Sequence, residues 1–145
     1  MFFFWKKKKV DYWERQVTKE KGVEEKKREW DLAPFSQNTY GALWYIRTFA
    51  LRDGKTYVYP VSDDARNWEV RATVLRREIL KTDAGNLKTI VVKPEVAVGG
   101  VLEPKGEVFF WLTDDDRKFI VKFESKLKIG KIIGYLKNIE RGTPP

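Results

Sequence analysis

Residues 106–136 read GEVFFWLTDDDRKFIVKFESKLKIGKIIGYL and decide the fold of the chain. The first run, residues 108–112, is apolar at every position, which is typical of a strand buried on both faces. In the next run apolar and charged side chains alternate, with Phe119, Val121 and Phe123 set against Lys118, Lys122 and Glu124. A period of two indicates a strand with one buried face. The three aspartates between the runs favour a turn, because carboxylates accept hydrogen bonds from nearby backbone N–H groups. The stretch therefore predicts an antiparallel hairpin, followed by a third strand over residues 128–138.

The same alternation extends upstream of this hairpin. Residues 68–74 give the clearest strand, and residues 56–61 place Tyr57, Tyr59 and Val61 on one face. The charged run at residues 76–78 interrupts the pattern, which suits a β-bulge or a bend in a long curved strand. The sequence Asp-Ala-Gly-Asn that follows at residues 83–86 predicts a turn. Pro94 should end the pairing of its strand or lie at an edge, because proline has no N–H to donate.

The first forty residues carry weaker signals. Residues 2–9 run from apolar to basic and predict an edge strand rather than a membrane-surface anchor, because so short an apolar run gives little anchoring. Residues 10–19 and 23–31 predict a second hairpin that turns at Lys21-Gly22. A helix over residues 23–31 stays open as an alternative, since its Glu, Lys and Arg residues would allow ion pairs at helical spacing.

A helix is predicted over residues 38–51. Asn38 can cap it, and Gly54 follows as a stop signal. One apolar stripe recurs at spacings of three and four, formed by Ala42, Leu43, Ile46, Phe49 and Ala50. These elements predict a mainly β fold, a curved antiparallel sheet or open half-barrel with this one amphipathic helix packed on its concave face. We expect a single domain over residues 1–145 with a frayed tail at 142–145. The expected core comprises Leu43, Ile46, Phe49, Trp68, Val70, Val74, Ile90, Val92, Phe110, Leu112, Val121 and Ile129.

The composition excludes several kinds of site. The chain has no Cys and no His, which removes thiolate and imidazole metal sites and any Ser-His-Asp triad. We expect no metal and no cofactor. The formal net charge of +8 would suit an anionic polymer or membrane surface, but the basic residues are spread over most expected strands, which is typical of a solvated surface. Peripheral association with an anionic membrane or the cell wall stays open.

No arrangement of carboxylates in the sequence selects a catalytic pair. The aspartates at residues 114–116 lack the alternating spacing of a calcium loop, so we interpret them, like Asp63-Asp64, as turn residues. A glycosidase would need two facing carboxylates, and the candidates lie beside a basic residue or in a turn. We therefore expect no catalytic residues and no enzymatic activity. We also expect no nucleic-acid partner, because Phe109 and Trp111 suit a covered central strand better than an exposed stacking surface.

Several short motifs, taken in order, resemble one protein family. They are YGALWYIR at residues 40–47, TDAG at 82–85, VKP at 92–94, WLTDD at 111–115 and ESKLKIG at 124–130. The chain resembles the domain-of-unknown-function family 3108 over residues 35–137, and the last two motifs are the most specific. The resemblance implies a mostly β protein of the periplasm or cell envelope of a Gram-negative bacterium, with no accepted activity. Chains of that family carry an export signal and further N-terminal strands, so we expect this chain to be the C-terminal part of a longer exported protein.

A curved sheet that one helix covers only in part would leave apolar surface open, and such surface usually marks an interaction site. We predict non-enzymatic binding in the envelope, either of a hydrophobic, lipid-like ligand or of an envelope protein partner. The candidate ligand-binding residues are aromatic, with one lysine: Trp44, Tyr45, Tyr57, Tyr59, Trp111 and Lys122. A cell-wall glycan binder or glycan-acting enzyme is one alternative, and a structural module without a ligand is another. A connected apolar cavity between helix and sheet would favour ligand binding.

Overall fold

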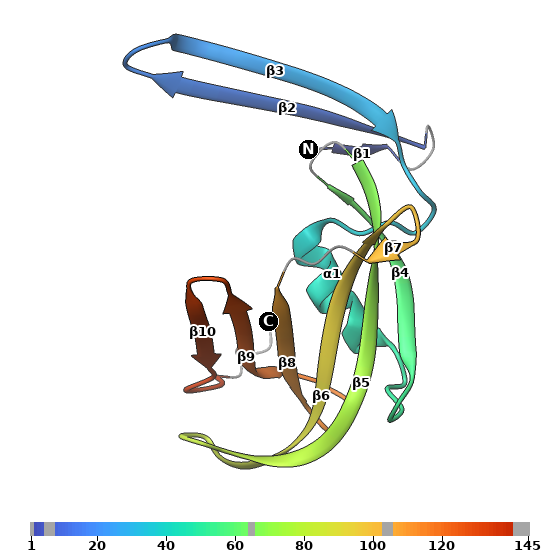
Figure 1. The fold of residues 1–145 in the computed structure, drawn as a ribbon, viewed down its shortest axis with the longest axis vertical. Coiled ribbons are helices and arrows are strands. Elements are labelled where there is room, and N and C mark those ends of the chain that lie inside the picture. The colour runs from blue at the N-terminus through green and yellow to red at the C-terminus, as the bar shows by residue number, and fades with distance from the viewer. Residues whose placement is uncertain (1, 5–7, 64–65, 103–105, 141–145) are drawn as a thin grey trace.

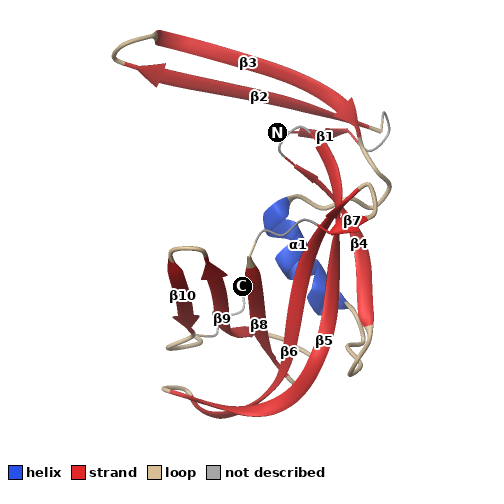
Figure 2. Cartoon of the chain, in the orientation of Figure 1, coloured by secondary structure: helices blue, strands red, loops and turns tan. Residues whose placement is uncertain are grey.

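Two antiparallel sheets and one short helix make up the fold in a computed structural model, which describes residues 2–4, 8–63, 66–102 and 106–140 (Figures 1 and 2). The helix α1 spans Thr39–Tyr45, and a 3-10 turn follows over Ile46–Thr48. The strands are β1 (Phe2–Phe4), β2 (Lys9–Thr18), β3 (Gly22–Asp31), β4 (Thr56–Asp63), β5 (Arg66–Thr82), β6 (Gly85–Val98), β7 (Val101–Leu102), β8 (Glu107–Thr113), β9 (Ile120–Leu127) and β10 (Gly130–Tyr135). The prediction of a mainly β fold with one helix is confirmed.

The smaller sheet has the order β1-β2-β3, and the hairpin β2-β3 extends away from the rest of the molecule (Figure 1). The predicted hairpin is thus confirmed, and the helical alternative for residues 23–31 is wrong. Among the described residues, the hairpin approaches the larger sheet at its base (Figure 1). There Val10 is fully buried, Trp30 Nε1 donates to Ser62 Oγ at 2.7 Å, and Asn67 Nδ2 donates to the Asp31 carbonyl at 2.7 Å.

The larger sheet has the order β10-β9-β8-β6-β5-β4, and β7 adds to β6. Its long strands β5 and β6 bend through a wide arc (Figure 1), and the pairing between them shifts at Val74/Arg76. The interruption seen in the sequence is therefore a β-bulge, as predicted. Pro94 stays paired with Ala72 on β5, while the pairing of β6 with β8 stops at Val92. Pro94 thus lies where one edge of its strand becomes free, as proline requires.

The helix α1 lies within the arc of β5 and β6 (Figure 2). Ala42, Ile46 and Leu51 pack with the buried residues of this face, which are Tyr59, Val61, Val70, Ala72, Val74, Ile90, Val92 and Leu112. Asn38 caps α1, its Oδ1 accepting from the backbone N–H of Gly41 at 2.6 Å. The predicted end at residue 51 is wrong, because Phe49 is already extended, with φ −84° and ψ 150°.

Aromatic side chains of β4 explain this early end of the helix. Tyr57 Oη donates to the Ala50 carbonyl at 2.5 Å and accepts from the Arg52 N–H at 3.1 Å. The ring of Phe49 lies 5.2 Å from that of Tyr57 and 5.9 Å from that of Tyr59. These contacts fix residues 49–52 in a loop that still faces the sheet. The apolar stripe of the sequence therefore continues after the helical hydrogen bonds have ended.

A second core cluster covers the opposite face of the sheet. Val91, Trp111 and Val121 are buried there, with Leu80, Leu87, Phe109, Phe119 and Leu136 packed around them. Trp111 and Leu112 are adjacent on β8 and belong to different clusters, because successive side chains of a strand point to opposite faces. The prediction that β8 is a central strand buried on both faces is confirmed.

Three details of the C-terminal strands differ from prediction. The pairing of β8 with β9 shifts between Trp111 and Leu112, so Lys122 and Glu124 lie on the Trp111 face with little exposure, while Phe123 is partly exposed. Ile129, expected in the core, is 97% exposed, because it lies in the short turn between β9 and β10. The third strand spans Gly130–Tyr135 rather than residues 128–138. The expected tail at 142–145, Asp64, and residues 5–7 of the first expected strand lie outside the described residues.

Candidate functional site

The two edges of the larger sheet differ in how they are closed. Beyond β4, the Gln37 N–H donates to the Pro60 carbonyl at 3.1 Å, and the Gln37 carbonyl accepts from the Ser62 N–H at 2.8 Å. Pro60 itself has no N–H to offer. A crossing segment and a proline thus block the second half of this edge, which is how proteins prevent unwanted strand pairing. At the other edge, no strand of the described chain pairs beyond β10.

Apolar side chains gather on the open edge. Six large apolar or aromatic side chains are exposed on β9, β10 and the turn between them: Phe123, Leu127, Ile129, Ile132, Ile133 and Tyr135. An open hollow of about 240 Å³ borders both strands, lined by Lys122, Phe123, Gly134, Tyr135 and the residues around them. The ring of Phe123 packs directly on Gly134, where a Cβ would overlap it. An exposed apolar edge strand invites the addition of another strand.

A cluster of charges and rings holds β10 against β9 and β8. Glu124 accepts from Lys131 Nζ at 2.8 Å and pairs with Lys122 Nζ at 3.4 Å. The ammonium of Lys122 lies 4.0 Å from the centroid of the Trp111 ring and 5.5 Å from that of Tyr135. The hydrogen bond from Lys131, with Lys122 acting in the same direction, holds the pKa of Glu124 below its ordinary value. The cluster therefore fixes the position of the edge strand.

Glu78 extends this cluster across the sheet to β5. Its Oε1 accepts from Trp111 Nε1 at 2.5 Å, and its Oε2 accepts from Arg76 Nε at 2.7 Å. The bond from Trp111, followed by that from Arg76, lowers the pKa of Glu78. A general acid needs the opposite shift. The cluster thus offers fixed charges and rings, and not a poised proton donor.

The six predicted ligand-binding residues fall into two groups on opposite faces of the sheet. Trp111 and Lys122 are in direct contact on the face away from α1. The other four lie on α1 or β4. Tyr45 packs edge-to-face on Tyr59 with ring centroids 5.4 Å apart, while Trp44 is exposed and stacks with the guanidinium of Arg47 at 5.0 Å.

Tyr59 shows what the second group does. Its side chain is buried, its Oη donates to the Ala42 carbonyl at 3.1 Å, and burial raises the pKa of its hydroxyl. Together with the bonds of Tyr57 to residues 50 and 52, this contact joins β4 to α1 and the loop after it. The space left between helix and sheet, lined by Leu43, Ile46 and their neighbours, is about 20 Å³. That volume holds about one water molecule.

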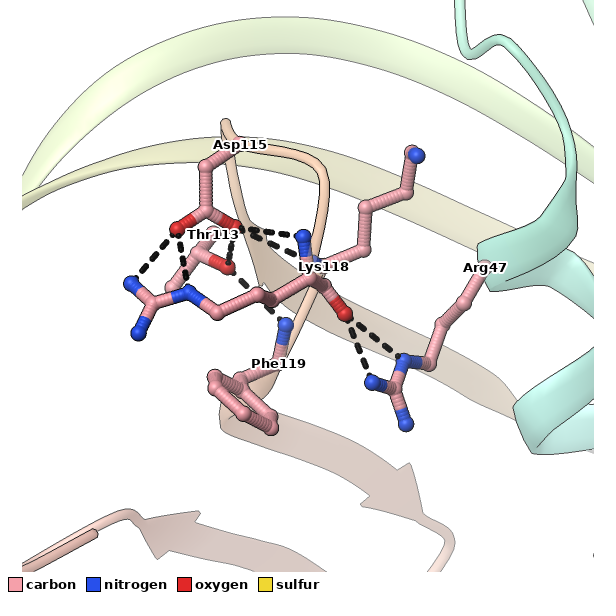
Figure 3. Close-up of polar contacts among 6 residues, drawn as sticks. Arg47, Thr113, Asp115, Lys118 and Phe119 are labelled. Carbon is pink, nitrogen blue, oxygen red and sulfur yellow. Dashed lines mark hydrogen bonds and ion pairs between the residues drawn. The ribbon is translucent and has the colours of Figure 1, made fainter. Parts of the chain in front are cut away.

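The acidic turn between β8 and β9 is closed by its own backbone (Figure 3). Asp115 Oδ1 accepts from Thr113 Oγ1 at 2.6 Å and from the N–H groups of Arg117 and Lys118 at 3.1 Å each. Thr113 Oγ1 in turn accepts from the Phe119 N–H at 2.9 Å. The hydroxyl of Thr113, with contributions from Arg117 and Lys118, lowers the pKa of Asp115 from 3.8 to about 2. Asp115 is therefore a turn residue, as the sequence predicted.

The same turn also binds the 3-10 turn that follows α1. Arg47 donates from Nε and Nη2 to the Arg117 carbonyl at 3.1 and 2.6 Å (Figure 3). Arg77 of β5 pairs with Asp114 at 3.0 Å and with Asp53 of the loop after the helix. Among the described residues, no group of carboxylates is placed to hold a metal ion. Asp114 thus joins this turn to β5, and the Arg117 carbonyl joins it to the 3-10 turn after α1.

Acid should weaken this turn. Because the folded-state pKa of Asp115 is about 2 and lies below its unfolded value, its ionised form stabilises the fold above about pH 4 and ceases to do so as the pH falls through 2. We expect Asp115→Asn to lower the melting temperature by a constant amount from pH 7 to about 4 and by progressively less towards pH 2. Thermal unfolding across this range measures the difference, with Asp116→Asn, an exposed neighbour, as the control. A difference that persists unchanged at pH 2 would contradict the role of the carboxylate.

The hairpin β2-β3 forms a third surface. An open hollow of about 460 Å³ lies along it, lined by Asp11, Tyr12, Trp13, Lys27, Arg28 and Glu29. Trp13 shares one face of the hairpin with Asp11, Lys27 and Glu29, and Tyr12 and Arg28 lie on the other. Within the described part of the chain, no helix has the length and apolar character needed to span a membrane.

The fold and these surfaces define an open, curved antiparallel sheet with one short helix, an edge at β4 that is blocked over its second half, and an apolar edge at β10. A family model described as "Protein of unknown function (DUF3108)" matches residues 1–137. The chain therefore belongs to this family, which confirms the resemblance found in its motifs and extends it over the N-terminal hairpin. No curated protein and no solved structure matches the chain.

None of the six predicted ligand-binding residues lies on the edge strand β10. Its signal was present in the sequence, because Ile132 and Ile133 are adjacent and so make both faces of the last strand apolar. A strand with two apolar faces at the end of a sheet has nothing beyond it to bury them. The sequence alone did not show that this strand lies at an edge, because strand order depends on pairings between distant residues.

Proposed function

We propose that the chain is a non-enzymatic binding domain of the bacterial cell envelope, and that its ligand is a protein partner. The observation that carries this proposal is the distribution of apolar surface. Exposed apolar side chains gather on β9 and β10, whereas the space beneath α1 is only about 20 Å³. Exposed apolar patches mark interaction surfaces, and a strand edge is suited to another polypeptide.

A lipid-like ligand beneath the helix is the less favoured form of the proposal. Pockets for small molecules span roughly 300–1,000 Å³, far more than the space between α1 and the sheet. Entry of an acyl chain would require α1 to move away from β4. The bonds from Tyr57 to residue 50 and from Tyr59 to residue 42 oppose that movement.

A cell-wall glycan is a second candidate ligand, and the hairpin hollow favours it. Trp13 is about half exposed there, and it shares its face of the hairpin with Asp11, Lys27 and Glu29. Aromatic rings flanked by hydrogen-bonding groups are the elements that a sugar-binding surface needs. Binding of purified peptidoglycan that Trp13→Ala abolishes would favour this candidate.

The envelope location is part of the proposal and comes from the family resemblance, because chains of the family are exported. A photo-crosslinking amino acid at Tyr135 and, separately, at Trp13, both in chains exported to the periplasm, tests for a protein partner. We expect a discrete protein adduct. Lipid extraction and mass spectrometry of the purified chain form the second arm. A stoichiometric lipid with no protein adduct from either position would overturn the proposal.

A further inference from the structure

The backbone of β10 has a row of hydrogen-bonding groups that point away from the sheet. The Leu136 N–H donates to the Val121 carbonyl at 2.9 Å. The backbone groups of Leu136 therefore point towards β9. Inward and outward groups alternate along an antiparallel strand, so residues 132 and 134 also face β9. The N–H and C=O groups of Lys131, Ile133 and Tyr135 therefore point outward.

The side chains next to this row differ between the two faces of the sheet. Ile132 shares its face with Phe123, whose ring covers Gly134, so this face is apolar. Lys131 lies on the other face with Ile133 and Tyr135, following the alternation of the strand. A strand added to β10 would therefore meet apolar side chains on one face and a basic, partly apolar row on the other.

The positive charge around the β10 edge indicates which kind of strand could bind there. Five lysines lie on β9, β10 and the segments beside them, at positions 122, 126, 128, 131 and 137. The only carboxylate of residues 120–137 is Glu124, which pairs with Lys131 and Lys122. Lys126 pairs with Glu107 of β8 at 2.9 Å, so positive charge still exceeds negative charge around this edge. A second copy of this chain would bring the same lysines against them, and like charges across a strand pair destabilise it.

We propose that the β10 edge binds an extended segment of another protein in which apolar residues alternate with Asp or Glu, added to the sheet as a further strand. This inference rests on the proposed function and names the recognised chemistry. The backbone of β10 supplies the main-chain hydrogen bonds, which provide affinity in such complexes. The apolar side chains of the partner pack on Ile132 and Phe123, and its carboxylates face the lysine row.

A proline substitution can test the outer edge of β10 without disturbing the rest of the fold. Ile133→Pro removes one outward N–H and leaves the bonds to β9 in place, as Pro60 does naturally on β4. The matched control is Val58→Pro on β4, the opposite edge strand. Val58 is exposed, and its N–H, like the nitrogen of Pro60, points away from β5. Both variants should retain the far-UV circular dichroism spectrum of the parent chain.

The probe is a fluorescein-labelled peptide of about ten residues, a strand-length segment, in which valine alternates with glutamate. Fluorescence anisotropy with the full chain should give saturable binding. We expect at least about a tenfold increase in Kd for Ile133→Pro and no change for Val58→Pro. The same peptide with lysine in place of glutamate should also bind at least about tenfold more weakly.

Three outcomes would overturn the inference. The first is no saturable binding of the glutamate peptide up to about 1 mM, or equal binding to the chain and to Ile133→Pro. The second is self-association of the chain, detected by sedimentation, that Ile133→Pro abolishes, since the occupant would then be a second copy. The third is a cellular protein adduct from Trp13 with none from Tyr135. That last result would leave the proposed protein-binding function standing and remove only the β10 edge from it.

Discussion

Replacing Trp111 with alanine is expected to lower the free energy of unfolding by about 3–5 kcal/mol, the usual cost of truncating a large buried aromatic side chain. The indole is 5% exposed and belongs to the core cluster on the face away from α1. Its removal also leaves the Glu78 carboxylate without its Nε1 donor and exposes the ammonium of Lys122, which lies over the ring. Urea unfolding followed by circular dichroism measures the change.

Two variants control for this experiment. Trp111→Phe keeps a ring beside Lys122 and removes the donor to Glu78, so it should cost less than the alanine variant. Asp116→Ala changes an exposed charge in the neighbouring turn and should change stability by about 0.5 kcal/mol or less. A cost for Trp111→Ala no larger than that of Asp116→Ala would show that this face of the sheet is not a core.

Replacing Leu112 with alanine is expected to cost about 2–5 kcal/mol, the range for leucine in a packed core. Leu112 is 1% exposed and faces α1, where it packs in the cluster with Ile46, Tyr59 and Val92. The cavity left behind borders the space of about 20 Å³ already present, so we also expect α1 to loosen. Chemical denaturation gives the free energy, and hydrogen exchange of the α1 amides reports the loosening.

A shape-conserving change provides the comparison for Leu112. Leu112→Met keeps most of the volume and should cost less than about 1.5 kcal/mol. Leu112→Ala should leave exchange on the hairpin β2-β3 unchanged, because, among the described residues, that hairpin approaches the larger sheet at its base. Small effects from both Leu112→Ala and Trp111→Ala would contradict the placement of β8 as a strand buried on both faces.

Local periodicity was enough to predict most strands and turns. The alternation of residues 68–74 and its interruption near residue 76 appear in the structure, and the turn predicted at residues 83–86 appears shortened, because β6 begins at Gly85. Periodicity failed where a distant contact changed the outcome. The apolar stripe of the helix continues to Leu51, but rings from β4 end the helix at Tyr45. A bulge between β8 and β9 moves Lys122 and Glu124 onto the face of Trp111, and no local pattern indicates a bulge there.

The candidate site was predictable only in part. Aromatic residues were sound candidates for contact surfaces, and Trp111 does meet Lys122. The sequence could not show that Tyr57 and Tyr59 would use their hydroxyls to join β4 to the helix. It also could not show which strands lie at the edges of the sheet. Strand order depends on pairings between strands that are not consecutive in the chain, such as β6 with β8.

The proline and the crossing segment at β4 have a consequence for stoichiometry. Because Pro60 and the segment at Gln37 block half of the β4 edge, the β10 edge of one molecule cannot pair along its full length with the β4 edge of the next. Each chain should then take up a single guest, and the complex should remain a discrete one-to-one particle that cannot grow into a fibre.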